Sequence, residues 1–255
     1  MNRRTMIIGL AGAAALGSRA LAVEKPFRVS LVGDEFIGEG WQTGVRIELA
    51  EGWKTYWRMP GDAGIPPLFA WNKGTLGDGR IEVLYPLPGR YQDASGETIG
   101  YKDEVIFPIR LKQADAMEMK LDLDLFFAVC REICIPAQSK AEIELGTAMR
   151  DPRGSALVGD WLSRIPQAGE VATMAEVVTE AGKPVLRLRL KEPARDIFVE
   201  ADGGAYFRAP VFTGDGREAV LPIDNVDDPA KLQSAALRLT FDMGGRGLEQ
   251  TLLLA

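Results

Sequence analysis

The sequence predicts an all-β protein: an antiparallel β-sandwich followed by a second, smaller β-domain. Apolar and charged residues alternate with a period of two in several short segments, a pattern that buries one face of a strand and exposes the other. Clusters of proline and glycine separate these segments, which is typical of a sandwich with short turns. The strands expected in the first domain cover residues 27–32, 45–49, 81–85, 105–111, 121–125 and 141–145.

One segment between the strand patterns has helical periodicity. The residues from Asp151 to Gly154 are interpreted as a linker, after which Ser155 is expected to cap a short helix that ends at Pro166. Alternating strand patterns resume beyond this helix. The sequence therefore predicts a first domain over residues 23–147 and a second over residues 155–255, which opens with the helix.

Residues 1–22 have the features of an export signal. Arg3 and Arg4 precede a short apolar run, and a small-residue A-x-A pattern predicts cleavage after Ala22. The paired arginines fit both the twin-arginine and the general secretory route. No later segment reaches the roughly 18–20 apolar residues that a membrane-spanning helix needs. We expect an exported, soluble protein of a bacterial periplasm, where disulfides persist.

Charge and residue usage exclude several classes of function. The formal net charge is −6, and a nucleic-acid-binding protein needs a basic surface that this sequence lacks. The chain has no histidine, which excludes a Ser-His-Asp triad, a Cys-His nucleophile and a histidine-ligated zinc site. We expect no metal and no bound cofactor. The reactive groups that remain are carboxylates, lysines and two thiols.

The two cysteines, Cys130 and Cys134, have the spacing C-x-x-x-C. Continuing the alternation from residue 121 puts Cys130 at the end of a strand, on the outer face. Pro136 is expected to interrupt the ladder, so that the next strand begins near Lys140. A disulfide between the pair would close a very short loop and contribute only about 2 kcal/mol of chain entropy. Such a bridge is a weak staple, and we interpret the pair as a redox site.

The roles of the two thiols follow from their predicted positions. Cys130 ends a regular strand and is expected to attack a partner's disulfide, while Cys134, in a freer loop, is expected to resolve the mixed disulfide. Two other interpretations stay open. The bridge could be a structural disulfide in a non-catalytic binding module, or the thiols could join Met117 and Met119 in handling copper(I), which favours soft ligands.

Four motifs in the first domain carry a family resemblance. Residues 52–64, GWKTYWRMPGDAG, resemble the signature G-W-x-T-Y-W-x-x-P-G-D-x-G of the amino-terminal domain of the thiol:disulfide interchange protein DsbD. The segments YPLP at 85–88, GYKDEV at 100–105 and VCREICIP at 129–136 continue the resemblance in the same order. The similarity covers about residues 23–146 and is greatest to the branch associated with suppression of copper sensitivity.

The resemblance implies an immunoglobulin-like sandwich whose Cys130 and Cys134 exchange disulfides. In that family the pair takes electrons from a membrane-embedded, thioredoxin-linked donor and passes them to periplasmic thioredoxin-like oxidoreductases. We expect the donor to be a separate protein, and no nucleic acid or stable membrane insertion. The family also shields its cysteines with an aromatic side chain on a cap loop. The corresponding segment, residues 92–98, departs from this pattern because it has no aromatic residue.

Overall fold

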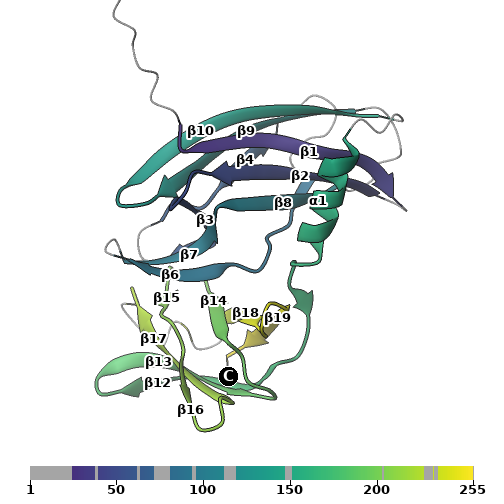
Figure 1. Ribbon diagram of the computed structural model, residues 1–255. Helices are drawn as coiled ribbons and strands as arrows, with labels where there is room; N and C mark the ends of the chain where they lie inside the picture. Colours follow the sequence, from purple (N-terminus) through teal and green to yellow (C-terminus); the bar gives the residue numbers. More distant parts are fainter. Residues whose placement is uncertain are drawn as a thin grey trace, which may run out of the picture.

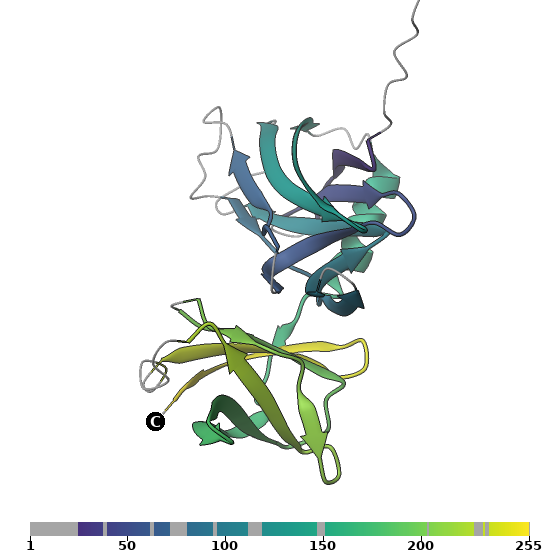
Figure 2. The same cartoon turned by 90° about the vertical axis from the view of Figure 1, so that its left-hand side faces the viewer.

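The computed structural model describes residues 25–37, 40–61, 64–71, 81–93, 96–111, 119–146, 151–202, 204–226, 232 and 235–254. The chain forms two β-rich bodies, one above the other in Figure 1 and again in the perpendicular view of Figure 2. The predicted fold class is confirmed: an antiparallel, immunoglobulin-like sandwich is followed by a smaller sandwich-like unit. The predicted export signal and the cleavage after Ala22 lie outside the described residues.

The first sandwich consists of two sheets. One sheet has the order β1-β2-β8-β5; its strands are β1 (Phe27–Ile37), β2 (Gly40–Leu49), β8 (Glu104–Leu111) and β5 (Ile81–Val83). The other has the order β10-β9-β3-β7-β6, and β4 also pairs with β9; its strands are β10 (Cys134–Leu145), β9 (Met119–Cys130), β3 (Lys54–Gly61), β7 (Gly96–Lys102), β6 (Gly89–Asp93) and β4 (Leu68–Trp71).

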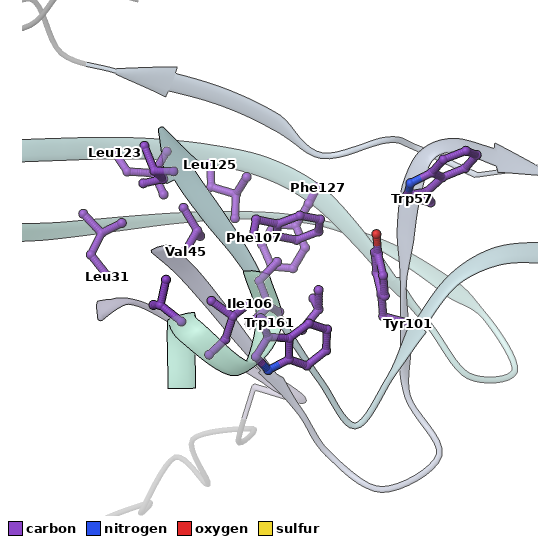
Figure 3. Packing of buried hydrophobic residues seen from close by; sticks show 14 of the residues in the cluster. Leu31, Val45, Trp57, Tyr101, Ile106, Phe107, Leu123, Leu125, Phe127 and Trp161 are labelled. Atoms are coloured by element: carbon purple, nitrogen blue, oxygen red, sulfur yellow. The ribbon is translucent and has the colours of Figure 1, made fainter. Parts of the chain in front are cut away.

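The core of the first sandwich lies between these sheets. Alternate residues of each strand point inward, and the side chains of Val45, Phe107, Leu123, Leu125 and Phe127 are completely buried. Figure 3 shows these residues gathered in one layer, with Trp57 and Tyr101 further along it. The inward set on β9 consists of odd-numbered residues, as the alternation predicts, so the even-numbered residues of β9 point away from this core.

The helix α1 (Pro152–Leu162) packs on the first sandwich, against β1, β2 and β8. Val158 and Trp161 enter the core of that sandwich, and Figure 3 shows Trp161 beside Ile106. The N-cap is Asp151, whose carboxylate accepts a hydrogen bond from the Gly154 amide, instead of the expected Ser155. Pro at the first helical position suits this earlier start. The second domain predicted from the sequence begins with this helix, whereas the packing of α1 places it on the first sandwich.

The second sandwich also has two sheets. One has the order β11-β19-β18-β14, and the other has the order β12-β13-β17-β15 with β16 also paired to β17. The strands are β11 (Gln167–Ala168), β12 (Ala172–Glu180), β13 (Lys183–Leu190), β14 (Asp196–Glu200), β15 (Tyr206–Phe207), β16 (Val211–Thr213), β17 (Glu218–Asp224), β18 (Ala236–Asp242) and β19 (Gly247–Leu253). They enclose a core of their own. The domain boundaries stay a prediction.

Charged side chains join the two sandwiches. Arg58 of β3 binds Glu200 and Glu249, with nitrogen–oxygen distances of 2.7 and 2.6 Å. Arg90 of β6 binds Asp196 at 3.0 Å, and the Arg90 guanidinium lies 5.0 Å from the ring centre of Phe198. These contacts involve β3 and the β6–β7 hairpin, which belong to the same sheet as the two cysteines.

Candidate functional site

The two cysteines form a disulfide at one end of the first sandwich. Cys130 is the last residue of β9 and Cys134 the first of β10, and the two are direct cross-strand partners with Cα atoms 4.1 Å apart. The disulfide thus closes a turn within one sheet and does not connect the two sheets. The expected interruption at Pro136 is wrong, because β10 begins at Cys134 and pairs Pro136 with Ala128. As an edge strand, β10 tolerates a residue without an amide proton.

The two sulfurs belong to residues of very different exposure. Cys130 is completely buried and packs with Tyr56, Ala128 and Ile65 in a small apolar cluster apart from the main core. Cys134 is exposed. Because thiol–disulfide exchange requires direct attack on a sulfur, an incoming protein meets the Cys134 side of the bridge first. Cys134 is therefore the more accessible of the two cysteines, and the order of attack stays a prediction.

A tyrosine hydroxyl contacts the exposed half of the bridge. The hydroxyl of Tyr56 donates a hydrogen bond to Cys134 Sγ at 3.0 Å, although Tyr56 itself is only 2% exposed. Its neighbour Thr55 is buried and donates from Oγ1 to the carbonyl of Ala128 at 2.9 Å. These bonds link β3 to β9 and β10 and place a polar donor beside a sulfur atom in an otherwise apolar cluster.

Tyr56 is not among the site residues predicted from the sequence. The signal was present in the alternation of β3, where Thr55 and Trp57 are buried among core residues and the residues between them belong to the opposite register. That register places Lys54 directly opposite Cys130 and brings Tyr56 to the cysteine face of the sheet.

Positive charge and apolar surface surround the bridge. Lys54 is nearly buried, and its ammonium and that of Lys102 lie 6.0 and 4.5 Å from the ring centre of Tyr91. Arg131, in the turn between the cysteines, lies over the ring of Trp53. Four large apolar side chains of this end of the sheet are exposed: Leu68, Phe126, Ile133 and Ile135. The bridge is thus bordered by the kind of exposed apolar surface that marks interaction sites.

The segment that corresponds to the family's cap loop joins β6 to β7. Its residues 94 and 95 lie outside the described part of the chain. On either side of them, Arg90 and Glu97 form an ion pair at 2.5 Å, and Glu97 accepts a hydrogen bond from the hydroxyl of Tyr206 in the second sandwich. The described part of this hairpin is therefore attached to the second sandwich.

The position of Met119 gives no support to a copper site built from two thiols and two thioethers. Met119 begins β9, at the opposite end of this 12-residue strand from Cys130, and packs against the main core. Met117 lies outside the described residues. Within the residues that the structure describes, no group of three or more histidine, cysteine, aspartate or glutamate side chains is placed to hold a metal ion.

Reducing the bridge is expected to leave the protein folded. The loop it closes is short, so oxidised and reduced protein should differ in unfolding free energy by no more than about 2 kcal/mol. Urea denaturation with and without reductant measures this difference, with the Cys130→Ala/Cys134→Ala double variant as the control for reductant effects. Global unfolding on reduction would identify the bridge as a structural staple.

The fold and the site together define the chain as an immunoglobulin-like β-sandwich protein with a disulfide between neighbouring strand ends. The family described as "Thiol:disulfide interchange protein DsbD, N-terminal" matches residues 18–145, and the chain belongs to this family. No curated protein matches the chain. The described residues contain no helix that is long and apolar enough to cross a membrane.

The solved structures that match this chain include the following two. The N-terminal periplasmic domain of ScsB from Proteus mirabilis is 21% identical, with a TM-score of 0.68, and the alignment covers 90% of this chain and 92% of that chain. This likeness establishes a shared fold. The YadV chaperone, at 10% identity and a TM-score of 0.26, covers 90% of this chain and 100% of its own, and is too distant to support an argument.

Proposed function

We propose that the protein is a periplasmic thiol–disulfide interchange protein that passes electrons through Cys130 and Cys134, from a membrane-embedded dithiol donor to periplasmic thioredoxin-like proteins. The observation that carries the proposal is a disulfide with one buried and one exposed cysteine at the open end of a sheet. Family membership supports the same chemistry. The predicted export signal supports the location, because disulfides persist in the periplasm.

The proposed reaction is two successive exchanges. In the reduced protein, the Cys134 thiolate attacks a disulfide of the partner, forms a mixed disulfide and releases one partner sulfur as a thiolate. The Cys130 thiol then attacks Cys134 Sγ, which re-forms the Cys130–Cys134 bridge and releases the second partner sulfur. Two electrons and two protons pass to the partner. The donor's dithiol restores the reduced protein by the reverse sequence, attacking first at the exposed Cys134.

Trapping of the mixed disulfide tests the proposal and the order of attack. The Cys130→Ala variant keeps the exposed thiol but has no resolving thiol, so it should accumulate a mixed disulfide with an oxidised thioredoxin-like protein. The Cys134→Ala variant keeps only the buried thiol and should trap far less. Non-reducing electrophoresis and mass spectrometry of the adduct measure both, and the double-alanine variant is the control.

Each outcome of the trapping experiment has a clear meaning. Adducts formed only through Cys130 would support the order of attack expected from the sequence, in which Cys130 attacks and Cys134 resolves. If neither single variant forms an adduct with any thioredoxin-like protein, the exchange function is contradicted. The binding-module alternative then applies, and titration in redox buffers distinguishes it, because a structural bridge stays oxidised down to about −300 mV or below.

A further inference from the structure

We infer that Tyr56 is a third functional residue of the redox site, beside the two cysteines, and that its hydroxyl stabilises the thiolate of Cys134 by a direct hydrogen bond. The inference rests on the proposed exchange function and adds to it a residue that sets the reactivity of the exposed thiol. Its starting point is the 3.0 Å contact between the Tyr56 hydroxyl and Cys134 Sγ.

The ring of Tyr56 is held in place on several sides. It packs with Ala128, Cys130 and Ile65 in the cluster beneath the bridge. The chain segment at Gly64 lies so close that a Cβ atom there would be 2.6 Å from two ring carbons of Tyr56. A side chain held this tightly in one place delivers its hydroxyl to the sulfur without the entropic cost of ordering a mobile group.

Burial makes the placement of this hydroxyl informative. A tyrosine hydroxyl withdrawn from water is normally hydrogen-bonded, and the Tyr56 hydroxyl donates to a sulfur atom. A sulfur in a disulfide accepts hydrogen bonds weakly, whereas a thiolate is charged and accepts them much more strongly. The contact is therefore worth more after reduction than before it, and this difference favours the thiolate state of Cys134.

The same hydrogen bond serves both directions of exchange. When the protein reduces a partner, it increases the fraction of Cys134 present as the attacking thiolate. When a donor reduces the protein, the donor's second thiol expels Cys134 from the mixed disulfide, and Tyr56 stabilises the leaving thiolate. Electrons and protons balance as in the exchange above, because Tyr56 donates a hydrogen bond but keeps its proton.

The test uses the Cys130→Ala background, in which Cys134 is the only thiol. We expect Tyr56→Phe to raise the pH midpoint of thiolate formation by about one unit, the effect of losing one hydrogen bond to a charged acceptor. Iodoacetamide alkylation and ultraviolet absorbance of the thiolate, each followed against pH, report this midpoint. Alkylation near neutral pH should slow about threefold, because the less stabilised thiolate is rarer but more nucleophilic.

Tyr85→Phe is the matched control. Tyr85 belongs to the same sandwich and packs its ring against Phe107, with ring centres 5.3 Å apart. This variant loses one hydroxyl while its midpoint should stay at the value of the parent. Phenylalanine preserves the ring in both variants, and thermal melts verify that both are folded.

A second readout uses the protein with both cysteines. In glutathione buffers, Tyr56→Phe should shift the equilibrium toward the disulfide, because the reduced state loses its stabilised thiolate. An unchanged midpoint in Tyr56→Phe, or an equal shift in Tyr85→Phe, would overturn the inference. Neither readout needs a partner protein. A failure of the trapping experiment would therefore contradict the proposed function, while the effect of Tyr56 on the Cys134 thiolate could still be measured.

Discussion

Replacing Arg90 with leucine is expected to destabilise the protein by about 3–5 kcal/mol, the cost of breaking a buried ion pair by removing one partner. Arg90 binds Glu97 of its own hairpin and Asp196 of the second sandwich, and the exposed fractions of these three side chains are 10%, 6% and 19%. Arg90 also donates to the carbonyl of Ile197. Leucine would leave the buried carboxylate of Glu97 and the partly buried carboxylate of Asp196 without this cation, and urea denaturation measures the loss.

The pH dependence of this loss has a predictable sign. Burial is the largest single effect on the Asp196 carboxyl and raises its pKa above the usual value, although the hydrogen bond and the charge of Arg90 act in the opposite direction. A carboxyl whose pKa is raised by folding stabilises the folded state at low pH, and this contribution is lost as the pH rises through the folded value. Removing Arg90 strengthens the effect of burial. The destabilisation should therefore be larger at neutral pH than at acidic pH, where Asp196 gains its proton.

Arg110→Leu is the control for this prediction. Arg110 pairs with Glu82 on the surface, where the two side chains are 62% and 41% exposed, so its loss should cost less than about 1 kcal/mol. Adding Asp196→Asn to the Arg90 variant removes one buried charge and should recover part of the stability. Equal costs for Arg90 and Arg110 would show that the contact between the sandwiches contributes little in solution.

Local alternation explains what could be predicted of the site from sequence. Charged and apolar residues alternate strictly in residues 121–125, and extending that register to Cys130 correctly places it at the strand end on the outer face. The expected break at Pro136 did not occur, because a proline ends a central strand but is tolerated on the outer side of an edge strand. Sequence alone does not say which strand lies at the edge.

Contacts between segments that are far apart in the sequence leave no alternation pattern from which they could be predicted. Arg58 and Glu200 are 142 residues apart, and Arg90 and Asp196 are 106 apart, so no periodicity links them. The sheet against which α1 packs could not be predicted from the helical periodicity of its sequence, for the same reason. Its apolar face is visible in the sequence, but the sheet that covers it is decided by tertiary packing, here with Asp151 accepting from the amide of Gly33 on β1.

Replacing Gly100 with alanine is expected to disturb the sheet that carries the cysteines. Gly100 of β7 is the cross-strand partner of Tyr56, and a Cβ at this position would lie 2.9 Å from Tyr56 Cα and closer still to the carbonyl oxygen of Thr55. Both obstacles are backbone atoms, which cannot turn aside as a flexible side chain can. Overpacking of this kind costs about 1–3 kcal/mol, and strand β3 must shift to relieve it.

The shift of β3 gives this prediction a second consequence at the cysteines. A displaced Tyr56 would lose its 3.0 Å contact with Cys134 Sγ, so alkylation of Cys134 should change in the same direction as in Tyr56→Phe. Gly40→Ala is the matched control, because among the described residues, its chain neighbours aside, a Cβ there would meet no atom within 4 Å. That variant should be neutral or stabilised by up to about 1 kcal/mol through the reduced entropy of the unfolded chain. If both glycine variants melt alike and react alike, the close approach of β7 to Tyr56 does not hold the redox site in place.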